Sequence, residues 1–164
     1  MNYTILHMGE TKESYYREAF EEFRKRMQAW GSLDAVALRP AKTPGRELSD
    51  DEVAQTLDKE ARVWEEMLSR PQYQKSYKIA LCIEGKSLSS EGLAALFDKV
   101  AVGGRNSIVF LIGSSWGLHE RVKAMCDLRL SFSPMTFAHS LFRVMLAEQI
   151  YRAVGIGKGS KYHK

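Results

Sequence analysis

Apolar residues along the chain form short continuous runs that are separated by longer amphipathic stretches. Runs in which apolar and polar positions do not alternate are typical of strands buried on both faces of a parallel sheet. The pattern predicts five strands, at residues 3–8, 33–38, 79–83, 107–112 and 128–132.

Between the runs, apolar residues recur every three or four positions, which is the period of an amphipathic helix. Ser49, with Glu52 three residues later, has the sequence of a capping box at a helix start, and Ser90 is predicted to cap a later helix. The predicted helices cover residues 16–30, 49–69, 90–100, 117–126 and 140–154.

Strands alternating with helices indicate an α/β fold, with a parallel-type sheet and helices on both of its faces. The chain has 164 residues, enough for one domain with a core of its own. It contains no internal repeat, low-complexity tract or linker. Residues 1–164 are therefore predicted to form a single domain.

The composition, with 45% hydrophobic and 27% charged residues, is typical of a folded protein. The N-terminus lacks the basic stretch of a signal peptide, and no run approaches the roughly 18 apolar residues of a membrane span. Cys82 and Cys126 lie within apolar segments and match no metal-ligand spacing. We expect reduced core cysteines, no metal, no membrane contact and a cytoplasmic location.

The net charge of +4 is confined to one end of the chain. The last 22 residues hold five basic residues and the single acid Glu148, so the rest of the chain balances to zero. A local excess of this kind predicts contact with a polyanion. A solvated basic tail fits the charge equally well.

Three predicted strands end in polar or glycine-containing segments, at residues 84–86, 113–117 and 133–136. Ligands of open parallel sheets bind at the carboxyl ends of the strands, and glycine lets a ligand approach the backbone closely. These segments are candidates for a ligand site, although plain turns that happen to contain glycine remain an alternative for each.

Two motifs resemble known sites without matching their context. Gly113–Gly117 fits the G-x-S-x-G nucleophile elbow around Ser115, and Asp127 and His139 follow in hydrolase order. The last two lie only 12 residues apart and no oxyanion-loop motif is present, so a serine hydrolase is a minor alternative. The glycines of Gly155–Gly159 follow a predicted helix and open none, which excludes a dinucleotide-binding fingerprint.

Four segments together resemble a known family. The chain is similar to the ribosomal RNA large subunit methyltransferase H family of the SPOUT class, over nearly its full length. The likeness includes shorter segments at residues 83–86 and 89–93. The four main segments are residues 111–118 (LIGSSWGL), 130–139 (LSFSPMTFAH), 148–153 (EQIYRA) and 162–164 (YHK).

The resemblance implies a SPOUT-like fold whose C-terminal helix threads a loop to form a trefoil knot, an exception to the rule that chains are unknotted. It implies a homodimer that binds S-adenosylmethionine in the knot. The implied substrate is a pseudouridine of the large-subunit (23S) ribosomal RNA, methylated at ring nitrogen N3 on assembled ribosomes. A non-catalytic RNA-binding module without a cofactor is the alternative function.

The resemblance also implies cofactor contacts, position by position. In the family a second glycine usually follows the one that corresponds to Gly113, and here Ser114 stands in its place, so the backbone there must tolerate a Cβ. The implied cofactor residues are Leu81, Gly113, Phe132, Ser133, Pro134, Met135, Thr136 and Phe137.

Methyl transfer is an in-line displacement, so the protein mainly positions donor and acceptor. The N3 proton of pseudouridine must leave, and a cation stabilises the anion that results. Arg152 lies one helical turn after Glu148 and either forms a surface ion pair with it or faces the crevice to contact RNA. His163 is the second catalytic candidate, as a proton acceptor or a phosphate contact.

The remaining candidates are assigned to RNA binding and to assembly. Tyr162 is a candidate for stacking on a base, whereas His139 is expected to pack at a helix start. The long C-terminal helix is apolar around most of its circumference, which predicts burial against the sheet and a partner subunit, or complete burial in a monomer. In a dimer, the tail of one subunit would complete the site of the other. The candidate RNA contacts are Arg143, Arg152, Lys158, Lys161, Tyr162, His163 and Lys164.

Overall fold

The five predicted strands form one parallel sheet in the computed structural model, which describes residues 1–163. The strand order across the sheet is β2-β1-β4-β3-β5, and each pairing is parallel. The strands are β1 (Asn2–Met8), β2 (Ser32–Leu38), β3 (Tyr77–Ser87), β4 (Ser107–Ile112) and β5 (Leu128–Ser131).

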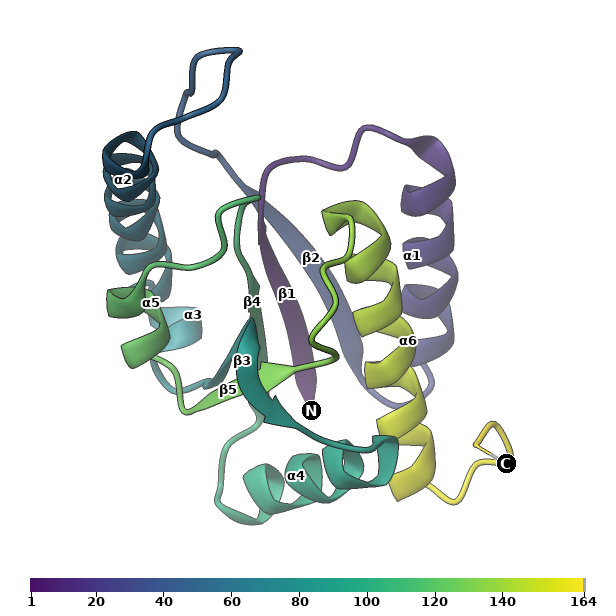
Figure 1. The fold of residues 1–164 in the computed structure, drawn as a ribbon. Coiled ribbons are helices and arrows are strands. Elements are labelled where there is room, and N and C mark those ends of the chain that lie inside the picture. The colour runs from purple at the N-terminus through teal and green to yellow at the C-terminus, as the bar shows by residue number, and fades with distance from the viewer. Residues whose placement is uncertain (164) are drawn as a thin grey trace.

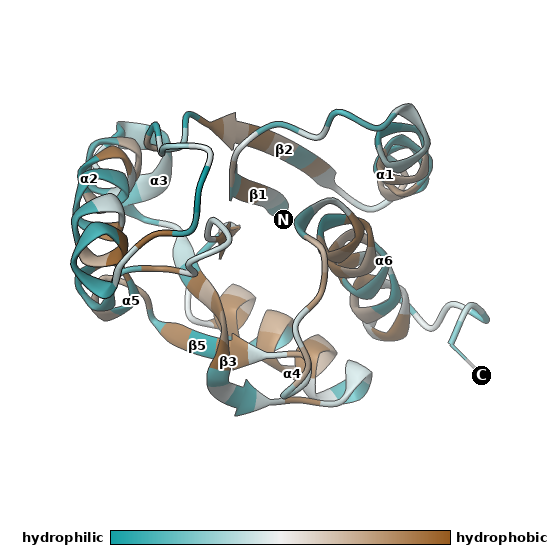
Figure 2. Ribbon diagram, turned by 45° about the horizontal axis from the view of Figure 1, so that its top comes forward, coloured by the Kyte–Doolittle hydropathy of each residue, from teal (hydrophilic) through white to brown (hydrophobic). Residues whose placement is uncertain are grey.

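Helices cover both faces of the sheet, as predicted (Figure 1). One core cluster joins one face to α1, α4 and α6, and a second joins the opposite face to α2, α3 and α5. Apolar strands lie between the two helix layers, and polar positions cover the outer side of α2 (Figure 2). The helices are α1 (Ser14–Met27), α2 (Asp50–Leu68), α3 (Pro71–Gln74), α4 (Ser90–Val102), α5 (Glu120–Ala124) and α6 (His139–Gly157).

Strand β3 is longer than the apolar run that predicts it. Its register against β5 shifts between Leu81 and Lys86, which both face Leu130, so the residues between them bulge out of the sheet. A Cβ on Gly85 would lie 2.6 Å from the carbonyl carbon of Leu130. Glycine therefore lets β3 pass close to β5, while the bulge directs Glu84 toward the carboxyl edge.

Helix starts follow the sequence closely, with one correction. Ser49 and Glu52 form the predicted capping box of α2. Helix α4 is capped by Ser89, whose hydroxyl accepts a hydrogen bond from the N–H of Gly92 at 3.0 Å. The predicted cap, Ser90, instead donates to the side chain of Gln149 in α6, at 2.7 Å. Of the two successive serines, Ser90 is bonded to a distant helix and Ser89 is left to cap α4.

The remaining sequence expectations concern cysteines, metals and membranes. Cys82 and Cys126 are both free, as predicted, and both are half-buried; burial raises the pKa of the Cys126 thiol to about 12. In residues 1–163 no three metal-ligating side chains gather into a site. Every helix of the described chain is too short or too polar to cross a bilayer.

Candidate functional site

The carboxyl ends of β3, β4 and β5 meet around a cavity of about 620 Å³, within the usual size of small-molecule sites. All three segments singled out by the sequence contribute to its wall: Glu84 in the bulge of β3, the turn Gly113–Gly117 after β4, and the loop at residues 132–137 after β5. The parallel arrangement brings these segments to one edge although they lie far apart in the chain.

Seven of the eight predicted cofactor residues line this cavity. The eighth, Pro134, belongs to the same loop but does not contribute to the wall. Phe142 of α6 adds an aromatic wall, since its ring lies 4.8 Å from that of Phe132 and stacks 6.0 Å from that of Phe137. The seven lining residues are Leu81, Gly113, Phe132, Ser133, Met135, Thr136 and Phe137.

The turn Gly113–Gly117 is held by its own backbone. The N–H of Gly117 donates to the carbonyl of Ser114 at 2.8 Å, and Gly117 has φ +82°, a conformation that favours glycine. A Cβ on Gly113 would lie 2.2 Å from the carbonyl oxygen of Gly117. Gly113 is therefore required by the closure of the turn itself, before any ligand is considered.

Ser114 fits the turn without strain. In the part of the chain that the structure describes, only glycines have positive φ, so the backbone tolerates a serine Cβ here. Its hydroxyl donates to the carboxylate of Glu60 in α2 at 2.7 Å. Glu60 is 3% exposed and was missed by sequence reasoning, because its partner lies 54 residues away.

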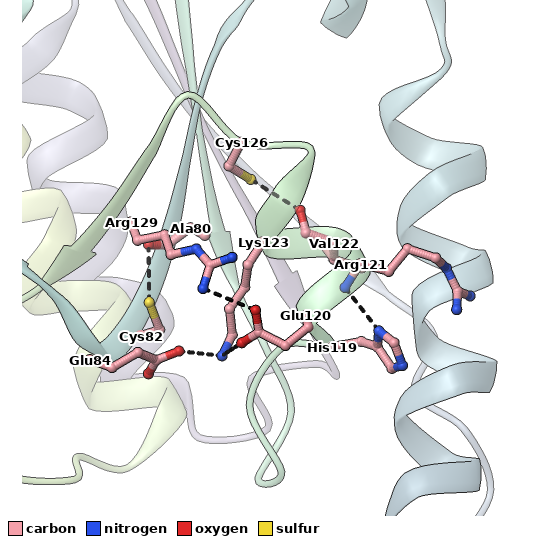
Figure 3. A network of polar contacts seen from close by, with 10 residues as sticks. All are labelled: Ala80, Cys82, Glu84, His119, Glu120, Arg121, Val122, Lys123, Cys126 and Arg129. Carbon is pink, nitrogen blue, oxygen red and sulfur yellow. Dashed lines mark hydrogen bonds and ion pairs between the residues drawn. The ribbon is translucent and has the colours of Figure 1, made fainter.

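Ion pairs surround the rim of the cavity near α5 (Figure 3). Lys123 lies between the carboxylates of Glu84 and Glu120, and Arg129 pairs with Glu120 at 3.0 Å. Burial lowers the pKa of Lys123, but the two carboxylates outweigh burial and raise it overall. The cavity therefore has a charged ammonium in its wall, at a position the sequence did not single out.

The two catalytic candidates lie together, with Arg152 in the last two turns of α6 and His163 in the segment after it, whereas the cavity is lined by the first turn of that helix. Arg152 donates through Nε to Glu148 at 2.9 Å, and its guanidinium lies 4.7 Å from the ring centroid of Tyr162. Nδ1 of His163 is 3.4 Å from Arg152, and its Nε2 is 2.8 Å from Glu91 of α4. The ion pair with Glu148 that the spacing favours is present, and the catalytic role of Arg152 stays a prediction.

This tail cluster (Glu148, Arg152, Tyr162 and His163) does not line the cavity of its own chain. A second cavity of about 530 Å³ lies between the two regions, with residues 130–132 shared between both walls. Phe23, Leu93, Val144 and Met145 make it largely apolar, and Glu148 belongs to its wall. One chain alone therefore keeps the two groups of predicted residues apart.

Comparison with known proteins decides the family. Residues 1–163 match the family described as predicted SPOUT methyltransferase. The chain belongs to this family. It is 43% identical to the ribosomal RNA large subunit methyltransferase H of Clostridioides difficile (strain 630) and 41% identical to that of Bacillus pumilus (strain SAFR-032), over 100% of both chains in each case. Among solved structures it is similar to the tRNA (m1G37) methyltransferase of Aquifex aeolicus, with 15% identity, a TM-score of 0.49, and coverage of 93% of this chain and 68% of that one.

The hydrolase alternative does not fit the geometry of this SPOUT methyltransferase. Asp127 accepts from the backbone N–H of Lys78 at 2.8 Å and pairs with Arg105 at 2.9 Å. It thus lies at the amino ends of β3 and β5, whereas Ser115 follows the carboxyl end of β4. Ser115 and Asp127 therefore lie at opposite edges of the sheet and do not form the catalytic group that the motif would require.

The basic residues of the SPOUT chain divide between surface and interior. Lys158 and Lys161 are exposed beside the tail cluster, and Lys164 lies outside the described residues. Arg143, assigned to RNA on the basis of charge, is buried at 7% exposure between Nε2 of His7 (3.2 Å) and the ring of Phe20 (5.0 Å). It is removed from the candidate RNA surface, because its side chain packs inside the domain.

His139 begins α6 and also lines the cavity of this SPOUT protein. Burial lowers its pKa, although the carboxylate of Glu60 acts in the opposite direction. His139 therefore lies at the helix start, as expected, but it is exposed at the cavity wall and does not pack inside the domain.

Proposed function

We propose that this protein transfers the methyl group of S-adenosylmethionine to N3 of a pseudouridine in the large-subunit ribosomal RNA, acting on assembled ribosomes in the cytoplasm. The observation that carries the proposal is the cavity at the carboxyl edge of the sheet. Seven of the residues that the family resemblance assigns to the cofactor surround it. The full-length relatives at above 40% identity are named as large-subunit RNA methyltransferases.

The residues around the cavity suit S-adenosylmethionine. A volume of about 620 Å³ is sufficient for a ligand of this size. Backbone groups of the turn Gly113–Gly117 and of the loop 132–137 are available to the edge of an adenine, and Phe137 and Phe142 offer an apolar wall. When bound, the cofactor supplies an electrophilic methyl group, and the chain's own task is to hold it in line with the acceptor.

The tail cluster supplies the groups that the acceptor requires. Arg152 is held in place by Glu148 and Tyr162, so its positive charge is fixed where it can stabilise the anion left on the base after loss of the N3 proton. His163 accepts that proton or contacts a phosphate. The exposed Lys158 and Lys161 bind phosphates as point charges.

Because one chain keeps the tail cluster away from its own cavity, the proposal includes a homodimer. The tail of one subunit would reach the cavity of the other. The apolar wall of the second cavity, with Val144 and Met145 of α6, is the surface that a partner would cover. The knot implied by the resemblance belongs to the same proposal.

The deciding experiment combines calorimetric titration with S-adenosylmethionine and transfer of a labelled methyl group to ribosomes that lack the modification. We expect binding without RNA and incorporation of one methyl group per ribosome. A chain that binds ribosomes but not the cofactor would instead be a non-catalytic RNA-binding module.

A further inference from the structure

Glu60 is a buried carboxylate whose hydrogen-bond partners in residues 1–163 are a hydroxyl and a backbone N–H. One of its oxygens accepts from the Ser114 hydroxyl at 2.7 Å, and the other accepts from the backbone N–H of Ala41 at 3.3 Å. In the same helix, Asp58 is partly exposed and pairs with Arg121 at 3.0 Å. Glu60 therefore differs from its neighbour in both burial and partner.

Burying a carboxylate is costly unless hydrogen bonds satisfy it, so a buried one without an ion pair requires a structural reason. The reason is that the two hydrogen bonds of Glu60 connect separate segments of the chain. Ser114 belongs to the cavity wall and its carbonyl closes the turn through Gly117. Ala41 lies in the loop after β2, a segment without helix or strand. One carboxylate thus connects this loop, helix α2 and the turn.

The turn is fixed at its two ends by the buried Ile112 and Leu118, and the residues between them make few hydrogen bonds within the described chain. Its hydrogen bonds are local, from the N–H of Gly117 to the Ser114 carbonyl and from the N–H of Trp116 to the Ser114 hydroxyl at 3.4 Å. Local bonds set the shape of a turn but not its position relative to the domain. The bond to Glu60 is the side-chain contact that ties the turn to a rigid helix, and a charged acceptor makes it a strong one.

We propose that Glu60 is a positioning residue for the cofactor, acting through Ser114 to hold the turn Gly113–Gly117 at the place where the cofactor contacts it. Glu60 itself does not line the cavity, so it acts only through the turn. The inference rests on the proposed function, because it assigns a role within that binding site.

The test compares variants by their KM for S-adenosylmethionine, their kcat and their thermal unfolding. Ser114→Ala removes the bond, and we expect KM and Kd for the cofactor to rise about tenfold, with little change in kcat at saturating cofactor. Glu60→Gln keeps both bonds, because the amide oxygen accepts from Ala41 and the amide nitrogen donates to the Ser114 hydroxyl. It should stay within about twofold of wild type.

Ser76→Ala is the matched control. The Ser76 hydroxyl is buried and bonded to that of Ser107 at 2.7 Å, at the amino ends of the strands. Its loss should lower the unfolding temperature as much as Ser114→Ala does but leave KM unchanged. Glu60→Ala should raise KM as much as Ser114→Ala does, and the double variant should raise it no further, because both changes break the same bond between Glu60 and Ser114. Glu60→Ala also loses the bond to Ala41, so its unfolding temperature should fall further.

The outcomes separate this inference from the proposed function. A wild-type protein that does not bind S-adenosylmethionine refutes both. If wild type binds and Ser114→Ala binds equally tightly, or if Ser76→Ala raises KM as much, Glu60 is only a structural residue. Should Glu60→Ala fail to fold, the comparison of Ser114→Ala with Ser76→Ala still decides.

Discussion

The cofactor cavity and the tail cluster are built in different ways. The cavity is lined by residues at the ends of three parallel strands and in the short loops that follow them. The tail cluster consists of side chains from α6 and the segment after it, which hold one another through charge and aromatic contacts. The residues that line the first cavity all come from one chain, whereas the cluster contributes only Glu148 to the wall of the second cavity.

The difference separates the two halves of the reaction. Under the proposed function, the domain as it folds binds the methyl donor, and the tail selects and deprotonates the acceptor. Helix α6 connects the two, since its first residue, His139, lines the cavity and Arg152 lies near its other end. Changes in the tail should therefore affect methylation while leaving cofactor binding unchanged.

Removing the tail should have the largest effect. A chain that ends at Lys158 loses Lys161, Tyr162 and His163, so we expect methylation of ribosomes to fall below detection and cofactor affinity to stay within about twofold. Each lost phosphate contact should also lower the slope of log affinity for RNA against log salt by about one. Filter binding in a salt series measures the RNA slope, and calorimetry measures the affinity for the cofactor. A truncated protein that methylates at the wild-type rate would show that the tail is only a solvated end.

Arg152→Ala should reduce turnover by about 10²–10³, the usual cost of losing one stabilising charge next to a developing anion. Cofactor affinity should not change. The salt slope should fall by at most about one unit, because one cation is removed. Arg62→Ala is the control, since Arg62 forms an exposed pair with Asp58 at the same i,i+4 spacing. If cofactor binding falls together with turnover, the cavity and the cluster are not separate.

Mixing two inactive variants tests whether the two regions meet across a dimer. Gly113→Ala damages the cavity, because its Cβ would lie 2.2 Å from the Gly117 carbonyl oxygen, and Arg152→Ala damages the tail. Random exchange of subunits in a two-fold dimer restores an intact site in about a quarter of all positions. We expect about that fraction of wild-type activity after co-refolding. No recovery would place cavity and tail of the same site in one chain.

Sequence reasoning succeeded where a residue's role depends on its near neighbours. The strands β1, β2 and β4 follow from continuous apolar runs, and the cavity loops follow from glycine and polar residues at strand ends. It failed where a contact with a residue far away in the sequence determines whether a side chain is buried. Glu60 lies on the apolar face of its helix, three residues after Leu57 and four before Trp64, but its charge predicts exposure. Arg143 belongs to a basic segment, yet it and Glu60 are both buried. Their partners, Ser114 and His7, lie 54 and 136 residues away.

The smallest predicted effect concerns pH at the cavity end of α6. His7 donates from Nδ1 to the carbonyl of Gly9 at 2.7 Å and faces Arg143 with Nε2 at 3.2 Å, so both nitrogens are used by the neutral ring. Burial, and then the charge of Arg143, lower the pKa of His7 to about 4. The tail end of α6 differs, because Arg152 there is paired with a carboxylate.

The sign of the effect follows from proton uptake. Between pH 6.5 and pH 4 the unfolded chain binds a proton at His7 and the folded chain does not, so the free energy of unfolding should fall as the pH falls. The loss is at most roughly 3 kcal/mol by pH 4. His7→Gln keeps a neutral polar side chain and should flatten the dependence in this window, as denaturant melts at several pH values would measure. If wild type and variant lose stability in parallel, acid acts on the carboxylates of the molecule and not on the buried histidine beside Arg143.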